Sequence, residues 1–445
     1  HTNGASQYGL VPAPYKVLDN DGLLDANSRI LFYLEAPFSI SLQDSSYSYN
    51  EHAYSEREYV LVGVTADEND GQMSSAAAVD VTPSRTIGAH LQYHVVDSAQ
   101  TNLIATGRRW FGDLFDFTTT RSYALPLEAL GNSPVTVDVR AVARASTSNT
   151  RLEVTGGNSV SFPAVGTNSV SNYVTERQLS TTLSSGSALN AITLEYDKAG
   201  NTGAAMWLDQ LMVNYFSDAT HENTPNYQKR FQNFARDSTK SSKIEIGATN
   251  PSSLVVFEIT DPEHVREVTA QKSANSLAWN SLEDSLRQYL VVAPEEAFEL
   301  RFERNDTLLN YSDFQSVANL IIAPDSLLEQ AQRLARLHTD RGLLSGAVAL
   351  DDIYALLNAG TPDIAAVREF LYTVYNAQGG ALQYLTLFGD ASYDYKEKLA
   401  ERSNLVPTFE SYQSFSLYSS YITDDYYGYL EQGEGLNWFV SSLDI

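Results

Sequence analysis

The sequence predicts a multidomain protein with N-terminal β-sandwich domains followed by an α/β domain that contains a parallel sheet. Three observations predict this architecture. The 445 residues exceed what one hydrophobic core usually serves. Apolar residues alternate with period two over the first two thirds, and strands alternate with helices from about Ser312 onward. We therefore expect four units, at residues 1–98, 99–220, 221–310 and 311–445.

The β part is predicted from short alternating segments that are separated by loops rich in Ser, Thr, Asn and Gly. An alternation of this kind buries one face of each strand, and many such strands are typical of β-sandwiches. The predicted strands are residues 29–36, 58–65, 90–97, 135–144 and 191–197.

Three further segments complete the β part. Residues 206–216 are expected to be the closing strand of a sandwich, with Trp207 and Leu211 packed inside. The polar residues 221–234 are interpreted as a domain boundary. Within residues 252–265, two strands are expected to flank an Asp-Pro turn.

The α/β part follows a strand–helix–strand–helix–strand order, which parallel strands require for their crossovers. In the first helix, Ser326 and Glu329 have capping-box spacing, and Gly342 is a stop signal. Thr361 is the expected cap of a later helix, with Pro362 at its first position. The predicted strands are residues 316–324, 343–350 and 382–388, and the predicted helical segments are residues 325–342, 351–360 and 361–380.

Acidic residues follow each of these strands, at the edge where ligand sites of open parallel sheets gather. Asp325, Asp351 and Asp352 are interpreted as residues of helix first turns, where negative charge is favourable. No helix plainly follows Asp390, which comes directly after the stretch "LQYLTLFG". A role of Asp390 in a ligand or metal site is therefore as well supported as a structural one.

A second acidic pair, Asp424 and Asp425, lies in the tyrosine-rich stretch "YITDDYYGYL". Adjacent carboxylates on a loop are suited to bind calcium or a cationic side chain. They are also typical of a solvated turn between two strands, and both interpretations remain open.

Composition excludes several classes of protein. The net charge of −26 repels phosphate backbones, so nucleic acid is not expected as a partner. The absence of cysteine excludes disulfides, thiolate metal sites and a cysteine nucleophile within these residues. No apolar stretch reaches the length of a membrane span. The polar start "HTNGASQYGL" is not a signal peptide, so we expect that one was removed or that the sequence begins inside a longer chain.

Common catalytic motifs are missing, including the phosphate-binding glycine motifs, the zinc motif of metalloproteases and the serine nucleophile elbow. His90 and His94 share one face of a predicted strand but lie two repeats apart, which argues against a zinc pair. No histidine follows the acidic sheet edge, so a base for nucleophilic catalysis is absent there.

The stretches "LIIAP", "QAQRLARL", "LDDIYALLNAGTPDIAAVREFLYTVYN", "LQYLTLFGDASYDYK" and "YITDDYYGYL" resemble the gingipain-type cysteine peptidase family, in its type IX secretion sortase branch. Earlier stretches such as "GRRWFGDLFDF" and "MWLDQLMVNYF" fit the same branch. The resemblance covers most of the chain and is most specific between Asn319 and Leu430.

This resemblance implies a caspase-like α/β fold, of which residues 311–445 would be the first part. It also implies a cysteine peptidase and transpeptidase on the extracellular face of the outer membrane. Such an enzyme removes C-terminal sorting domains from secreted cargo proteins and attaches the cargo to lipopolysaccharide. The implied partners are the cargo, an outer-membrane β-barrel protein and other proteins of the attachment complex.

The sequence departs from the family at the catalytic dyad. In the family, the histidine and cysteine follow a strand that corresponds to Leu443–Asp444–Ile445, where this sequence stops. We therefore expect no catalytic residue and no activity from these residues alone. By position in the motifs, Asp390, Asp424 and Asp425 are the candidates for the substrate cleft. No cofactor is needed for the chemistry, structural calcium remains an alternative, and metal ligands are unknown.

Two other functions compete with this interpretation. The chain would be a non-catalytic β-sandwich surface protein that docks cargo or an outer-membrane partner, or a glycan hydrolase that uses Asp390 with Asp424. The stretch "LDNDGLLD" at residues 18–25 is acidic enough for calcium but lacks the full register of a calcium loop, which favours a turn.

Overall fold

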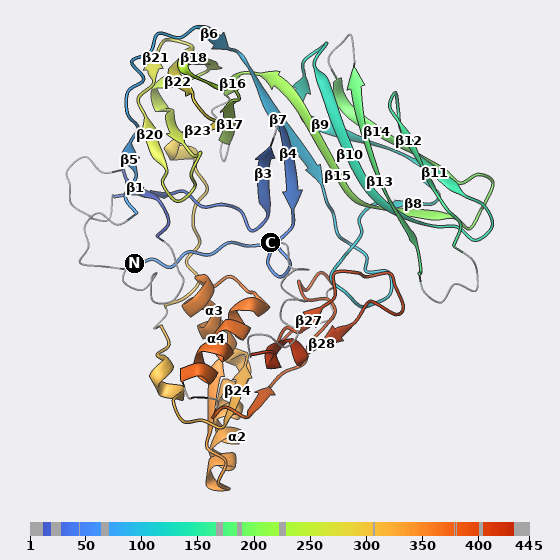
Figure 1. Ribbon diagram of the computed structural model, residues 1–445, viewed down its shortest axis with the longest axis vertical. Helices are drawn as coiled ribbons and strands as arrows, with labels where there is room; N and C mark the ends of the chain where they lie inside the picture. Colours follow the sequence, from blue (N-terminus) through green and yellow to red (C-terminus); the bar gives the residue numbers. More distant parts are fainter. Residues whose placement is uncertain are drawn as a thin grey trace.

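The computed structural model describes residues 12–18, 28–43, 45–63, 71–165, 172–184, 189–221, 228–305, 308–377, 379, 381–399 and 404–430. Two β-sheet lobes lie next to each other, and a third lobe contains the helices (Figure 1). We call these the first sandwich, the second sandwich and the α/β lobe. The multidomain architecture predicted from the sequence, with β-sandwiches before an α/β part, is confirmed.

The first sandwich consists of two antiparallel sheets. One sheet has the strand order β13-β10-β15-β7, with β8 paired to β15, and the other has the order β12-β11-β14-β9. Inward residues alternate with outward ones, as in β10, where Val135, Val137 and Val139 are buried. The strands are β7 (Ala89–Val96), β8 (Leu114–Phe115), β9 (Thr120–Ala129), β10 (Pro134–Arg144), β11 (Thr150–Val154), β12 (Ser159–Phe162), β13 (Thr175–Ser184), β14 (Leu189–Asp197) and β15 (Ala205–Asp218).

β15 confirms a predicted strand but corrects the orientation of one residue. Leu211 is buried in the sandwich core, whereas Trp207 lies half-buried on the opposite face, beside Phe111 and Phe415. The cause is a β-bulge at Asp209, because Arg140 and Ala141 of β10 pair with Gln210 and Leu208 and leave Asp209 unpaired. The extra residue shifts the period-two alternation by one, so Trp207 and Leu211 no longer share a face.

The second sandwich also consists of two sheets, in the orders β16-β18-β22-β21 and β17-β23-β19-β20-β5, with β6 paired to β18. Its core contains the fully buried Phe231 and Ile244. The strands are β5 (Ser74–Ser75), β6 (Arg85–Ile87), β16 (Thr220–His221), β17 (Gln228–Asn233), β18 (Asp237–Ala248), β19 (Val255–Glu258), β20 (Arg266–Val268), β21 (Gln271–Lys272), β22 (Ser276–Glu283) and β23 (Arg287–Val292).

Two predictions about the second sandwich have opposite outcomes. The strands predicted on either side of the Asp-Pro turn are confirmed, because β19 pairs antiparallel with β20. The predicted boundary at residues 221–234 is wrong over its last part, because residues 228–233 form β17, the edge strand of a sheet. Its polar side chains hid this strand, but the buried amide of Asn233 donates to Ser281 and to the Leu282 carbonyl.

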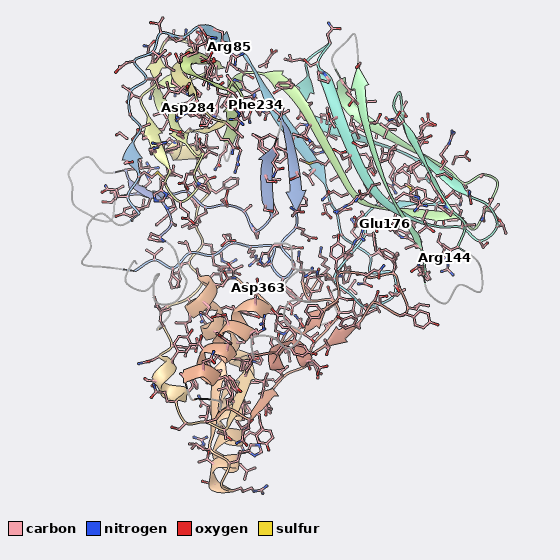
Figure 2. All side chains as sticks on the ribbon, viewed as in Figure 1. Arg85, Arg144, Glu176, Phe234, Asp284 and Asp363 are labelled. Carbon is pink, nitrogen blue, oxygen red and sulfur yellow. The ribbon has the colours of Figure 1, made fainter. Side chains whose placement is uncertain are left out.

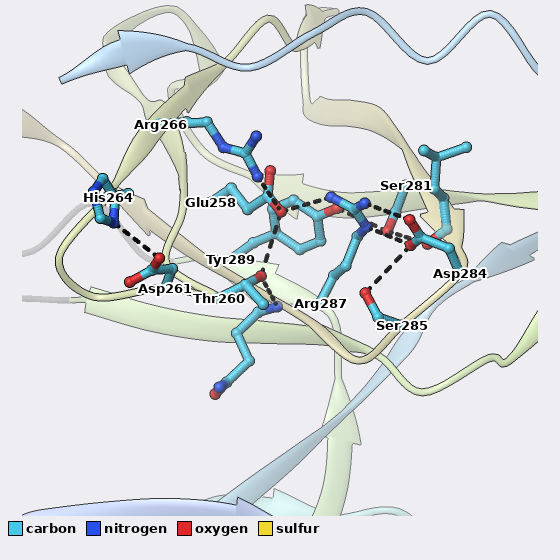
Figure 3. A network of polar contacts seen from close by, with 12 residues as sticks. Glu258, Thr260, Asp261, His264, Arg266, Ser281, Asp284, Ser285, Arg287 and Tyr289 are labelled. Carbon is cyan, nitrogen blue, oxygen red and sulfur yellow. Dashed lines mark hydrogen bonds and ion pairs between the residues drawn. The ribbon is translucent and has the colours of Figure 1, made fainter. Parts of the chain in front are cut away.

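One polar network ties three strands of the second sandwich together (Figure 3). The buried carboxylate of Glu258 in β19 accepts from Arg287 of β23 at 2.6 Å and lies 3.2 Å from Arg266 of β20. Arg287 also pairs with Asp284 at 2.9 Å. A buried carboxylate with two cationic partners avoids the penalty of an unpaired charge.

The described residues among the first 98 are divided between two small two-stranded sheets and the sheets of both sandwiches. Their later strands join both sandwiches, since β7 enters the first and β5 and β6 enter the second. The predicted boundary at residue 98 therefore does not separate two sheets. Two hairpins remain, one of β1 (Tyr15–Val17) with β2 (Ile30–Phe32) and one of β3 (Ser39–Gln43) with β4 (Ser46–Asn50).

The strand predicted at residues 58–65 is wrong for residues 58–63, and its last two residues lie outside the described part. Residues 58–63 find no strand partner but contact the α/β lobe. Glu58 accepts a hydrogen bond from Thr361, and Tyr59 lies against Gly360. His52 nearby is 3.6 Å from Asp363, at the end of the lobe that faces the sandwiches (Figure 2).

The α/β lobe contains the predicted parallel sheet. β24 (Asn319–Ala323) lies between β25 (Ser345–Ala349) and β26 (Tyr384–Leu387), and all three strands run in the same direction. Helix α2 (Leu328–Asp340) covers one face with Ala331 and Ala335. Helices α3 (Leu350–Asn358) and α4 (Ile364–Ala377) cover the other face. The apolar residues on one face of α4 are all buried, namely Ile364, Val367, Phe370, Leu371 and Val374.

Both predicted helix caps are wrong. Ser326 lies in a 3-10 turn (Asp325–Leu327), and α2 starts after Leu327 without a side-chain cap. Thr361 donates to Glu58 instead of capping α4, and the carboxylate of Asp363 accepts from the amide of Ala365. For Thr361, a contact outside the local motif determines where the side chain points.

Short elements complete the α/β lobe. They are a 3-10 turn at Tyr311–Phe314, the strands β27 (Phe409–Glu410) and β28 (Ile422–Thr423), and the turn η5 (Asp425–Gly428). None of the helices within the described ranges is long and apolar enough to cross a membrane.

Candidate functional site

The sheet of the α/β lobe has a topological switch point. The chain passes from the central β24 to β25 on one side and then returns to β26 on the other side. In such sheets, a crevice opens at the carboxyl ends of the two strands where the direction of winding changes. Here these ends are Ala323 of β24 and Leu387 of β26.

Gly389 brings the two strand exits together. A Cβ atom on Gly389 would lie 3.0 Å from Leu405 and Val406 and 3.6 Å from Pro324, which follows β24. A larger residue would crowd these side chains, so the glycine permits their close approach to the chain after β26. Asp390 follows with an exposed side chain, and its carbonyl accepts from the amides of Leu405 and Val406.

The acids that follow β24 and β25 meet around one arginine. Arg304 lies 3.1 Å from Asp325, 3.8 Å from Asp351 and 3.0 Å from Asp352. Asp351 and Asp352 are in the first turn of α3, as predicted. The prediction that the acidic exits share one edge of the sheet is confirmed for these residues. The sequence did not single out Arg304, which connects the segment after the second sandwich to this edge.

Asp424 and Asp425 lie at the turn that follows β28. Both carboxylates are exposed, and the amide of Asp425 donates to the Thr423 hydroxyl. The next residues, Tyr426 and Tyr427, are buried, and the Tyr427 hydroxyl donates to the Pro407 carbonyl.

The described residues show no hydrogen bond or ion pair that joins Asp390 to Asp424 or Asp425, and among them no group of three acidic or histidine side chains is arranged to hold a metal. The three cleft candidates therefore remain predictions as a group. The calcium interpretation of residues 18–25 falls almost entirely outside the described residues.

The loop after Asp390 is held by a buried acid that the sequence did not indicate. Asp394 is fully buried, and its carboxylate accepts from the amides of Lys398 at 2.8 Å and Leu399 at 2.6 Å. The two tyrosines of this loop pack against other side chains. Tyr393 stacks on Trp110, and Tyr395 is buried, which raises the pKa of its hydroxyl well above the ordinary value.

Glu410 of β27 is the most perturbed carboxyl group of the α/β lobe. It is fully buried, and neither oxygen has a hydrogen-bond partner among the residues described. Its pKa is raised to about 9, chiefly by burial; Arg108 opposes this shift and the charge of Asp394 adds to it. The Nη1 atom of Arg108 is also buried without a partner in the described part. Spacing alone could not identify Glu410, because its burial results from contacts with distant segments.

Replacing Glu410 with glutamine is expected to stabilise the protein more as the pH rises. The folded state keeps the proton up to about pH 9, whereas the unfolded chain releases it near the ordinary value of 4.5. The stability linked to this proton is thus present below pH 4.5 and is lost as the pH rises toward 9. At pH 8 we expect Glu410→Gln to be more stable by roughly 1–3 kcal/mol.

Melting temperatures of both proteins between pH 5 and 9 check this expectation. Glu195→Gln, at an exposed position of the first sandwich, is the matched control and should show no such trend. A difference between wild type and Glu410→Gln that stays constant over this range would show that Glu410 does not titrate in it.

A cavity of about 330 Å³ lies beside the outer edge of β26. Its lining combines residues from α4, from β26 and its start, and from the segment after β28. Aliphatic and tyrosine side chains dominate this lining, which is typical of a small-molecule or side-chain pocket. The lining residues are Leu371, Tyr375, Leu382, Gln383, Tyr384, Leu385, Tyr427, Gly428, Tyr429 and Leu430.

One family model matches the part of the chain that forms the α/β lobe. Residues 312–443 match Peptidase family C25, so the resemblance to gingipain-type peptidases is confirmed for this part of the chain. The three-stranded parallel sheet with helices on both faces agrees with the caspase-like α/β fold that the resemblance implied.

One solved structure extends this likeness to nearly the whole chain. It is the dimeric latent PorU from Porphyromonas gingivalis, with a TM-score of 0.72, 19% sequence identity and coverage of 95% of this chain and 41% of that chain. The overall fold is therefore shared, and the chain spans about two fifths of the length of that structure.

Other comparisons add nothing to this likeness. The crystal structure of the infectious bursal disease virus VP2 subviral particle overlaps with a TM-score of only 0.18 at 7% identity, over 59% of this chain and 49% of that chain. The search of curated proteins gave no match.

Proposed function

We propose that this chain is the N-terminal part of a cell-surface cysteine peptidase and transpeptidase that serves as a sortase of type IX secretion. The observation that carries the proposal is the match of residues 312–443 to Peptidase family C25 on a sheet with an open switch-point edge. The fold shared with PorU over 95% of the chain supports the particular branch. Residues 311–445 would form the front part of the catalytic domain.

The proposed reaction is acyl transfer through a thioester. A cysteine thiolate attacks the carbonyl carbon of the scissile peptide bond while a histidine takes the thiol proton and passes it to the leaving amine. The C–N bond breaks, and the C-terminal sorting domain departs. A nucleophile of lipopolysaccharide then attacks the thioester and regenerates the thiol. The 445 residues contain no cysteine, so they contribute scaffold and cleft wall, with Asp390, Asp424 and Asp425 as cleft candidates.

The proposal includes the surroundings of the enzyme. Its substrates are secreted cargo proteins with C-terminal sorting domains, and its other partners are an outer-membrane β-barrel protein and the remaining attachment complex. The site of action is the extracellular face of the outer membrane. The negative net charge of −26 agrees with the absence of a nucleic-acid partner from this proposal. Calcium, if bound, would have a structural role.

A thiol-blocking experiment tests the proposed function. We expect the complete parent protein to remove the sorting domain from a purified cargo and to lose this activity by at least about a hundredfold after treatment with iodoacetamide, because the thiolate is the nucleophile. The 445-residue chain alone should not cleave the cargo. Cleavage that persists after complete alkylation would contradict a cysteine mechanism.

The same experiment separates the alternative of a non-catalytic docking protein. Under that alternative, the complete protein binds cargo and releases no fragment, with or without iodoacetamide. The large apolar side chains that are exposed in the α/β lobe include Tyr412, Tyr418, Tyr421 and Tyr429, so a docking face would be sought there before the sandwich sheets.

A further inference from the structure

Residues 107–111 of the first sandwich reach into the α/β lobe and contact two of its loops. We call this segment the wedge. One loop, residues 390–399, follows β26 and begins at Asp390. The other, residues 407–416, contains β27. These two loops belong to the part of the lobe that carries the cleft candidates. Contacts that hold the loops in place therefore affect the geometry of the proposed site.

The wedge holds the second loop through its backbone. The amide of Arg108 donates to the Ser411 carbonyl at 3.0 Å, and the amide of Arg109 donates to the Ser414 hydroxyl at 2.6 Å. Gly107 has a positive φ of 74°, and a Cβ atom there would lie 2.2 Å from the Gln413 carbonyl oxygen. No other residue fits at this close approach without moving the loop.

The wedge also holds the first loop. The Tyr395 hydroxyl donates to the Arg108 carbonyl, and the Trp110 ring stacks on Tyr393 with centroids 5.9 Å apart at an interplanar angle of 15°. Both aromatic partners come from residues 390–399. The five residues of the wedge therefore contact both loops. The backbone amides of Arg108 and Arg109 bind the second loop, and the Arg108 carbonyl and the Trp110 ring bind the first.

Arg109 anchors the wedge to the body of the first sandwich. Its guanidinium, which is largely buried, lies 2.6 Å from Glu176 of β13 and 2.9 Å from Asp209, the bulged residue of β15. Glu176 lies at the end of the sandwich that faces the α/β lobe (Figure 2). The same guanidinium packs over the rings of Tyr412 at 5.2 Å and Phe415 at 5.6 Å. Charge pairs on one side and rings on the other join the sandwich to the second loop.

The second loop passes this anchoring on to the acidic turn. The amide of Ser411 donates to the Tyr421 carbonyl, and the amide of Tyr421 donates to the Ser411 hydroxyl at 3.0 Å. β27 then pairs with β28, which ends directly before Asp424. Asp390 is the first residue of the other loop. Each cleft candidate is therefore one short segment away from a residue that the wedge holds.

We propose that the wedge is a positioning element of the substrate cleft: it sets the relative placement of the loops that carry Asp390 and Asp424–Asp425. That the cleft binds a substrate rests on the proposed function. That the wedge places these loops concerns the structure of this chain alone. Arg109 is the central positioning residue and acts through Tyr412. The first sandwich therefore helps to shape the proposed cleft of the α/β lobe and is not an independent module.

Hydrogen exchange on the 445-residue chain tests the structural part. Tyr412 is 51% exposed, so its replacement leaves the core intact. In Tyr412→Ala, we expect the amides of residues 408–424 to exchange about tenfold faster, because the ring under the guanidinium is lost. Arg109→Lys keeps the charge but loses the planar stacking surface and should have the same effect.

Two control variants define the result. Tyr412→Phe retains the ring and should match the wild type, and Tyr418→Ala removes a tyrosine that is 73% exposed in the same loop region and should also leave exchange unchanged. If residues 408–424 exchange at wild-type rates in both Tyr412→Ala and Arg109→Lys, the wedge does not position them. Equal acceleration in Tyr418→Ala would mean that the region responds to any loss of a tyrosine, which also overturns the proposal.

Kinetics on the complete parent protein test the functional part. For cleavage of cargo, we expect Tyr412→Ala to raise KM about tenfold with kcat changed less than twofold, since a misplaced cleft weakens binding before it alters the dyad. Tyr412→Phe should restore the wild-type KM. An unchanged KM in Tyr412→Ala overturns the positioning role. A wild-type protein that cleaves nothing refutes the proposed function instead, while the exchange result still decides the role of the wedge.

Discussion

Replacing Phe370 with alanine is expected to destabilise the α/β lobe by about 3–5 kcal/mol, through lost burial and the cavity that remains. Phe370 is fully buried in α4, where its ring packs against Tyr311 at 5.6 Å and Phe314 at 5.5 Å. Both partners belong to the 3-10 turn that precedes β24. The cavity would therefore separate α4 from the turn that leads into the sheet.

Thermal unfolding, followed by calorimetry, measures this effect as a lower melting temperature of the transition that involves residues 308–430. Phe117→Ala is the matched control, because the Phe117 side chain is fully exposed and should be neutral within about 0.5 kcal/mol. A Phe370→Ala protein that melts like the Phe117→Ala protein would contradict the assignment of Phe370 to the core of the lobe.

Replacing Asp209 with alanine is expected to destabilise the protein by about 3–5 kcal/mol, because it leaves buried positive charge with too few partners. Asp209 is buried at the β-bulge and lies 2.9 Å from Arg109 and 3.0 Å from Arg140. After the substitution, the half-buried Glu176 at 2.6 Å is the one carboxylate left to Arg109 among the described residues. The effect should be felt at the contact between the first sandwich and the α/β lobe, where Arg109 lies.

The exposed ion pair of Arg151 with Glu153, in β11 of the same sandwich, supplies the matched control for Asp209. Because water screens this pair, Glu153→Ala should change the free energy of unfolding by less than about 1 kcal/mol. Urea unfolding curves of both variants compare them directly. Equal small effects would mean that water also screens the Arg109–Asp209 pair.

Local patterns in the sequence predicted the α/β lobe well. The stripe from Ile364 to Val374 has the period of a helix. The apolar runs around Ile321 and Val348 are short, and each of the three segments is bounded by glycine or proline. Their burial on both sides of the sheet follows from this pattern. The cap at Thr361 was wrong because its hydroxyl donates to Glu58, and a single cap hydrogen bond is weak enough to lose to such a tertiary contact. The cap at Ser326 was wrong because α2 begins only after Leu327.

The β part shows where such patterns fail. The strand predicted at residues 58–65 has the right alternation, but no neighbouring strand is available for residues 58–63. For β17 the error is the reverse. Its polar residues were interpreted as a boundary segment, but they form a strand that pairs with β23. A strand is stabilised by its partners, so alternation by itself cannot establish that a strand forms.

The candidate site was predictable only in part. Acidic residues at the ends of parallel strands were expected from the order of elements, and the cluster of Asp325, Asp351 and Asp352 confirms that expectation. Arg304, Asp394 and Glu410 were missed. Their roles depend on segments that fold back onto the strand exits from elsewhere in the chain, and one sequence has no local signal for such an approach.

By itself, the sequence determined the β-to-α/β order of the chain, the parallel sheet and the acidic edge, because period, charge and glycine placement act over a few residues. Only the tertiary structure decided that a bulge at Asp209 reverses Trp207, that Glu410 is buried without a partner among the described residues, and that Arg109 holds a loop 305 positions away. These features arise from the packing of distant segments, whose contacts are not encoded in any single window of residues.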